Sequence, residues 1–310
     1  VNGYGLSASI ADYNNDGWDD IYVCNDFHED DYYYINNQDG TFKESLDKAF
    51  STISRFSMGS DAADINGDDY QDLITLDMLP KTERVLKETE GDETMFNMQV
   101  HLKKLGYKDQ YSRNMLQINN SGTYFEETAL FNKVANTDWS WAPLFGDVDN
   151  DGFRDLLITN GFPRDITDKD FANYRADVGN IATNRQLLDS IPIVKIPNYA
   201  YRNKGDLTFE DSGDAWGLNK PSFSNGAAFV DLDGDGDLDY VVNNINDPAF
   251  IFENTLNDSP EKPNFLRVKL KGTSANPDGL GAKIVLEMAE GNRLYQEQQI
   301  VRGYMSSIES

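Results

Sequence analysis

Short runs of β-branched and aromatic residues recur along this chain, and polar residues separate them. Four such runs begin at Ile21, Leu73, Leu156 and Tyr240, each directly after an Asp- and Gly-rich segment. β-Branched and aromatic residues favour strands, whereas Gly and Asp favour turns. A strand-like run also precedes the polar segment, as in residues 227–230. The pattern therefore predicts a β-hairpin at each of the four places.

A second pair of strands follows each of the first three hairpins. An aromatic run, a polar turn and a further short run make up residues 32–44, 114–126 and 199–210. Four antiparallel strands per repeat is the size of one β-propeller blade. The fourth repeat has only a third strand, at 249–253, before the pattern changes. We therefore predict an all-β fold in which residues 1–258 form four consecutive propeller blades, the fourth incomplete.

Two insertions interrupt the repeats, and both are rich in charged residues and helix formers. Apolar residues in 80–112 follow a loose helical period, and 163–197 contains a helix start signal at Thr167. Pro192 and Pro197 lie where this second stretch should end. We predict helical excursions on one rim of the propeller.

The polar segment inside each hairpin follows one pattern, D-x-[DN]-x-D-[GD]-x-x-D. We name the four copies the first to fourth acidic loops: residues 12–20, 64–72, 147–155 and 231–239. Oxygen side chains at loop positions 1, 3, 5 and 9, with a backbone carbonyl at position 7, suit Ca²⁺, which takes about six to eight oxygen ligands. The candidate side-chain ligands are Asp12, Asn14, Asp16, Asp20, Asp64, Asn66, Asp68, Asp72, Asp147, Asp149, Asp151, Asp155, Asp231, Asp233, Asp235 and Asp239, and the candidate carbonyls are those of Trp18, Tyr70, Phe153 and Asp237.

An EF-hand is the main alternative for such loops, but it requires Glu at position 12 and a helix on each side. Position 12 is here Val23, Thr75, Ile158 or Val242, and strands flank the loops. We therefore expect about four structural Ca²⁺ ions on hairpins. The second acidic loop carries Asp69 at position 6, where the others have Gly. Because a sharp turn there favours Gly, we predict that this loop binds calcium most weakly.

The net charge of −26 arises from 53 Asp and Glu against 27 Lys and Arg, and 17 of these acids lie in the four loops. Such a charge disfavours binding to nucleic acid or to anionic lipid. The single Cys24 allows no disulfide within the chain. Neither an apolar run of membrane-spanning length nor a signal-peptide pattern occurs, so we expect no membrane insertion.

No residue pattern predicts catalysis. His28 and His101 stand in unrelated contexts, and neither has metal-ligand spacing to another His or Cys. The sequence lacks a G-x-S-x-G elbow. We assign no catalytic residue, although the many acids leave a carbohydrate-active site open. The aromatic residues Trp139, Trp141, Trp216 and Tyr32–Tyr34 could stack on sugars, but packing between blades is the favoured interpretation.

The repeats resemble a known family. Phe145-Gly146 before the third acidic loop and Gly226–Phe229 before the fourth are similar to FG-GAP/VCBS repeats. These build the seven-bladed propellers of integrin α chains and of many bacterial surface proteins. The resemblance implies calcium binding, placement outside the cell or on the bacterial surface, and further propeller blades outside this chain.

The last part of the chain resembles a different module. The segments Asn264–Gly272, Asn276–Ala282 and Arg302–Tyr304 are similar to the start of an ASPIC/UnbV domain, as in the cartilage-acidic-protein-like family. Asn136–Gly146 resembles Bacteroidetes members of that family. We therefore expect residues 264–310 to begin a second β domain.

The resemblance implies a binding module, not a particular reaction, because propellers host many functions. We expect a rigid face that binds a glycan or an extracellular protein. The alternatives are a polysaccharide-lyase-like enzyme on the same calcium-stabilised propeller and a structural spacer.

Overall fold

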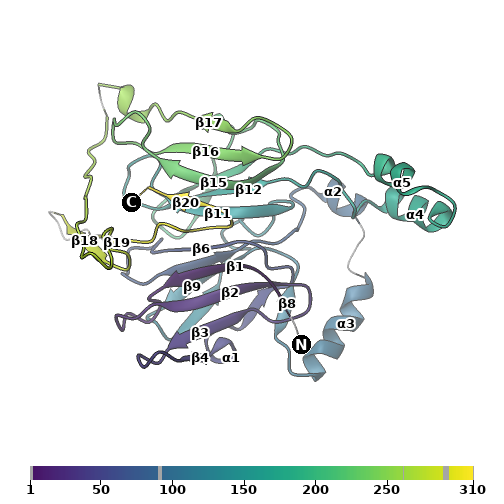
Figure 1. The fold of residues 1–310 in the computed structure, drawn as a ribbon, viewed down its shortest axis with the longest axis horizontal. Helices are drawn as coiled ribbons and strands as arrows, with labels where there is room; N and C mark the ends of the chain where they lie inside the picture. The colour runs from purple at the N-terminus through teal and green to yellow at the C-terminus, as the bar shows by residue number, and fades with distance from the viewer. Residues whose placement is uncertain (1–2, 90–92, 261, 289–292, 310) are drawn as a thin grey trace.

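A computed structural model describes residues 3–89, 93–260, 262–288 and 293–309. The chain forms four four-stranded sheets, which correspond to four blades placed one after another as in a propeller (Figure 1). The first blade contains β1 (Tyr4–Ala11), β2 (Asp20–Asp26), β3 (Tyr32–Asn36) and β4 (Phe42–Glu44). The second contains β6 (Ser60–Ala63), β7 (Asp72–Thr75), β9 (Met115–Asn120) and β10 (Tyr124–Glu127). The third contains β11 (Ser140–Gly146), β12 (Asp155–Asn160), β13 (Tyr199–Asn203) and β14 (Phe209–Asp211).

The fourth blade is completed in a way that the sequence did not indicate. Its own repeat supplies three strands, β15 (Ser224–Val230), β16 (Asp239–Asn244) and β17 (Phe250–Phe252). The fourth strand is β20 (Ser307–Ile308), which comes from the end of the chain and pairs in parallel with β15. Strand β20 thus lies on the β15 side of this sheet, whereas the other blades place their fourth strand on the opposite side. The expected incomplete sheet is therefore four-stranded.

Apolar side chains fill the space between successive blades. The strands that begin the blades, β1, β6, β11 and β15, pack against one another in chain order. Between the first two blades, the rings of Phe50 and Phe125 stack with centroids 4.3 Å apart. Between the third and fourth, Phe229 packs so close to Gly146 that a Cβ on this glycine would lie 2.8 Å from the Phe229 ring. The Phe-Gly pair before the third acidic loop therefore serves blade packing.

The aromatic residues that could have stacked on sugars take part in these contacts to different extents. Tyr33 is buried between the first two blades, and Trp216 packs at the edge of the core between the last two. Trp139 is half-buried and stacks on Phe162, with ring centroids 4.2 Å apart. Cys24 is a free, buried thiol.

Both insertions contain the predicted helices. The first holds α2 (Glu83–Glu88), α3 (Glu93–Lys104) and β8 (Asp109–Tyr111). Strand β8 pairs with β5 (Thr52–Ser54), which follows the short helix α1 (Leu46–Ala49) between the first and second blades. The second holds α4 (Lys169–Val178) and α5 (Asn184–Ser190). Figure 1 places α2 to α5 at one end of the blades. Within the described part of the chain, none of the helices has the length and apolarity that a membrane crossing needs.

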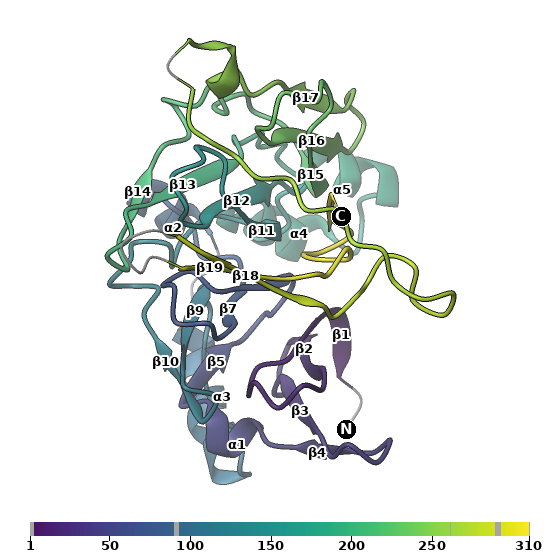
Figure 2. The same cartoon turned by 90° about the vertical axis from the view of Figure 1, so that its left-hand side faces the viewer.

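The C-terminal segment returns to the blades after the 3₁₀ turn η1 (Leu256–Asp258). Its hairpin, β18 (Lys283–Glu287) and β19 (Arg293–Glu297), lies at the end of the blades opposite the helices and crosses in front of them (Figure 2). The division into 1–258 and 264–310 stays a prediction. Strand pairing through β20 and the ion pairs described below join the two parts.

Candidate metal-binding loops

Each acidic loop connects the first two strands of its blade. In all four hairpins the residue before the loop pairs with loop position 9, as Ala11 does with Asp20 and Gly146 with Asp155. Strands therefore flank every loop, which confirms the hairpin prediction and excludes the helix–loop–helix of an EF-hand.

The first Asp of each loop shapes the turn by accepting backbone N–H groups from residues further along it. The Oδ1 of Asp12 accepts the amide of Asp16 at 3.0 Å, and its Oδ2 accepts that of Gly17 at 2.7 Å. Asp147 accepts the corresponding amides at 3.0 and 2.9 Å. Asp64 and Asp231 do the same. The four loops thus share one hydrogen-bonding pattern.

Carboxylate oxygens converge in the third and fourth acidic loops. Asp147, Asp149 and Asp151 each offer an oxygen within 4.8 Å of the others, and Asp231, Asp233 and Asp235 do likewise. Carboxylates so close to one another repel unless a cation or protons lie between them. These two clusters could hold a metal ion, and they are made of the hard oxygen donors that Ca²⁺ prefers.

The first and second acidic loops have an Asn amide at position 3 instead of a third carboxylate. Asn14 donates from Nδ2 to Asp16 at 3.2 Å, and Asn66 donates to Asp68 at 3.1 Å. The amide oxygen of each side chain accepts a loop N–H and remains a hard donor. These loops therefore keep the oxygen at position 3 but carry less negative charge there.

Two positions in each loop adopt the left-handed backbone conformation. Position 6 does so in all four loops, including Asp69 with φ of 67°. The positive φ on which the ranking of the second loop depends is therefore present, whereas the ranking itself stays a prediction. Position 4 is the second such site, and its residues are the two types that tolerate positive φ best: Asn15, Gly67, Asn150 and Gly234.

The Asp at position 9 is buried and connects the loop to the third strand of its blade. In the third loop, Asp155 accepts the amide of Val148 at 3.1 Å and that of Asn203 at 2.9 Å. Asp72 and Asp239 repeat this arrangement. Burial raises the pKa of Asp155 to about 8 and that of Asp20 to about 7. Each oxygen keeps a second lone pair, so this role is compatible with metal ligation.

An Asn at the end of the third strand links neighbouring blades and was missed from the sequence. Asn203 donates from Nδ2 to the carbonyl of Ile65, in the loop of the preceding blade, at 2.9 Å and to that of Arg154 at 3.1 Å. Asn119 and Asn254 make the equivalent bonds to the preceding loops at 2.8 Å. The only sequence signal is an Asn directly after each third-strand run.

Every acidic loop also has a basic side chain beside it. In the third loop Arg202, from β13 of the same blade, approaches Asp149 at 2.5 Å and Asp151 at 2.9 Å. In the first loop Lys283 of β18 lies 2.6 Å from Asp12. Arg293 pairs with Asp69 in the second loop, and Arg267 pairs with Asp231 in the fourth.

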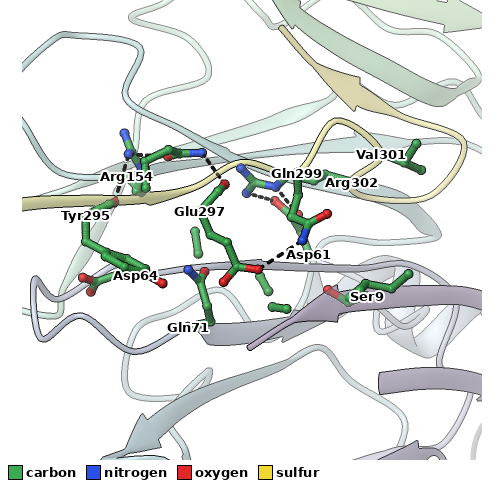
Figure 3. Close-up of a pocket in the computed structure, with 15 residues that line it drawn as sticks. Ser9, Asp61, Asp64, Gln71, Arg154, Tyr295, Glu297, Gln299, Val301 and Arg302 are labelled. Atoms are coloured by element: carbon green, nitrogen blue, oxygen red, sulfur yellow. Dashed lines mark hydrogen bonds and ion pairs between the residues drawn. The ribbon is translucent and has the colours of Figure 1, made fainter. Parts of the chain in front are cut away.

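Two cavities lie where the C-terminal segment meets the blades. A small one, of about 20 Å³, is lined by Asp61, Glu297 and Arg302, and Figure 3 shows the last joined to Asp61 by hydrogen bonds. A larger one, of about 340 Å³, lies between the second and third acidic loops and β19.

His28 follows β2 and His101 lies in α3, and neither belongs to a metal-ligand cluster among the described residues.

The repeated loops and sheets define a β-propeller chain with candidate cation sites at one end of its blades. Comparison with family models specifies the repeat: residues 12–75 and 193–242 match the FG-GAP-like repeat, and residues 272–310 match ASPIC and UnbV. The chain therefore carries FG-GAP-like repeats followed by an ASPIC and UnbV segment. The third acidic loop lies outside the matched residues yet has the same geometry. No curated protein sequence matches the chain.

Proposed function

We propose that this chain is a calcium-binding β-propeller segment of an extracellular or cell-surface protein, and that it presents a rigid face to a glycan or protein ligand. The observation that carries the calcium proposal is the repetition of one loop geometry four times, with carboxylate oxygens converging in two of the copies. Chance acidic turns would not share the same hydrogen-bonding pattern.

The donor set favours Ca²⁺ over other common ions. All candidate ligands are oxygens, which disfavours zinc and copper, whose sites use His and Cys. Mg²⁺ demands near-octahedral geometry and keeps several waters, whereas Ca²⁺ accepts a flexible set of carboxylate, amide and carbonyl oxygens. Each ion would take the side chains at positions 1, 3, 5 and 9 and the carbonyl at position 7.

The expected effect of the ion is mechanical. Position 1 organises the loop and position 9 joins it to the third strand, so one ion bound to both would fix the whole end of a blade. Binding to the folded state alone stabilises a protein by about 2.7 kcal/mol when the ligand is at 100 times its dissociation constant. Calcium should therefore raise the melting temperature.

Calcium titration by calorimetry, with melting curves in calcium and in EDTA, tests this proposal. Asp149→Ala should remove one binding event, because it deletes a carboxylate from the third loop. Asp189→Ala, which deletes an exposed acid on α5, should leave the stoichiometry unchanged. Identical melting temperatures in calcium and in EDTA would show that the loops are not structural calcium sites.

We place the ligand-binding face at the end that carries α2 to α5, because the C-terminal hairpin crosses the opposite end. This end also presents Trp139 and Phe162, a half-buried stacked pair. A flat aromatic surface of this kind suits the apolar face of a sugar.

A glycan array probed with the chain and with Trp139→Ala tests the assignment. Tyr124→Ala is the matched control, because this exposed Tyr begins β10 directly after the turn at Gly122, which lies beside Asn14 of the first acidic loop. Glycan binding that survives Trp139→Ala would place the face elsewhere.

A further inference from the structure

The contact between the C-terminal hairpin and the first acidic loop involves the residue that organises that loop. The Nζ of Lys283 lies 2.6 Å from the Oδ2 of Asp12 and 2.6 Å from the Oδ1 of Asn15. The side chain of Asp12 is 2% exposed and that of Lys283 is 30% exposed. Glu297, on the second strand of the hairpin, accepts the backbone N–H of Asp12 at 3.4 Å. An ammonium group therefore lies beside the position 1 carboxylate, where a calcium ion would bind.

The same segment places cations on two other acidic loops, through Arg293 at Asp69 and Arg267 at Asp231. Its composition fits this role. Residues 262–293 contain six Lys and Arg against three Asp and Glu, in a chain whose net charge is −26. The third loop differs, because its cation, Arg202, comes from its own blade.

We propose that the C-terminal segment is a built-in cationic ligand of the acidic loops, so that calcium in the first loop and the docked β18–β19 hairpin compete for Asp12. This inference rests on the calcium-binding function proposed above. Two cations beside one buried carboxylate repel each other, so each weakens the binding of the other. By thermodynamic linkage the effect is reciprocal. The factor by which the docked Lys283 lowers the affinity of the loop for calcium is also the factor by which bound calcium lowers the equilibrium constant for docking of the hairpin.

The release should be local. Arg302 forms two hydrogen bonds with buried Asp61, at 2.8 and 2.6 Å, and β20 pairs with β15, and neither contact involves an acidic loop. Calcium would thus loosen β18 and β19 while β20 stays in place. The acidic end of the propeller would become more accessible when calcium is abundant.

Terbium luminescence gives a readout for the first loop alone. Terbium binds in place of calcium and emits light when an excited Trp nearby transfers energy to it. Trp18 stands at position 7 of the first acidic loop, and the other acidic loops contain no Trp. The full chain would be titrated with terbium under Trp excitation, and Trp18→Phe should abolish the signal. Lys283→Gln should bind terbium at least about fivefold more tightly than the wild type, the lower end of common coupling energies. Lys269→Gln is the matched control, since Lys269 lies in the same segment and has no ion pair among the described residues.

Hydrogen exchange tests the reciprocal effect. Calcium should speed amide exchange in β18 and β19 of the wild type and leave β20 unchanged. Lys269→Gln, the control used above, should not alter this response, because Lys269 contacts no acidic loop among the described residues. If calcium binds by calorimetry but Lys283→Gln leaves terbium affinity and exchange as in the wild type, the competition is wrong and calcium binding stands. If no calcium binds to any variant, both proposals fail.

Discussion

Backbone conformation at single residues determines whether an acidic loop can close. Gly17 has φ of 88°, and a Cβ added there would meet nothing within 4 Å. The strain of Gly17→Ala would therefore come from the backbone alone, and we expect it to destabilise the fold by about 1–2 kcal/mol. Urea unfolding measures this loss. Gly5→Ala is the control, because that site is not left-handed and its Cβ would make ordinary contacts. Equal effects of the two variants would mean that positive φ at position 6 is not what requires Gly.

A second residue-scale prediction concerns Asp31, a buried acid outside the acidic loops. It accepts the amide of Asn25 at 2.7 Å and the hydroxyl of Tyr22 at 2.6 Å, yet burial raises its pKa to about 7. The folded state therefore holds a proton that the unfolded state releases near pH 4, so stability falls as the pH rises from about 4 to 7.

Asp31→Asn removes this titration. The free energy of unfolding of the variant, minus that of the wild type, should increase as the pH rises from 4 to 7, because only the wild type loses the stability linked to this proton. Denaturation at several pH values in this window measures the difference. A difference that does not change with pH would show that Asp31 ionises normally in the folded protein.

At the scale of elements, the hairpins and helices could be predicted because their signals are local. The strand runs that begin at Ile21 and Leu156 appear as β2 and β12, and both insertions form helices. Strand β20 could not be predicted, because its two residues carry no pattern and pair with β15 across 79 positions. The acidic loops were visible from spacing alone, whereas the bond from Asn203 to Ile65 depends on two blades meeting.

This bond between blades leads to a prediction at the same scale. Asn203→Ala would leave the buried carbonyls of Ile65 and Arg154 without their side-chain donor and would free the N–H of Gly205. An unsatisfied buried polar group costs about 1–3 kcal/mol, so we expect a loss of about 2–3 kcal/mol. Chemical denaturation measures it. Asn37→Ala, whose side-chain bond is exposed, should change stability by less than about 0.5 kcal/mol.

At the scale of the whole molecule, Arg302 joins the C-terminal segment to the middle of the propeller. Its guanidinium pairs with Asp61 of β6 and donates to the carbonyl of Phe145 in β11 at 3.3 Å. Asp61 also accepts the N–H of Phe145 at 2.7 Å. Both side chains are buried, at 6% and 1% exposure, so neither charge has water as an alternative partner.

Because removal of one partner leaves an uncompensated buried charge, we expect Arg302→Met to reduce the free energy of unfolding by about 3–5 kcal/mol. The double variant Arg302→Met with Asp61→Asn should recover part of this loss, since Asn keeps an acceptor for Phe145 without the charge. Arg185→Met breaks an exposed pair on α5, with atoms 3.8 Å apart, and should change stability by less than about 1 kcal/mol. Denaturant unfolding of the three variants decides the matter. If Arg302→Met behaves like Arg185→Met, the buried pair does not hold the C-terminal segment against the blades, and β20 alone must do so.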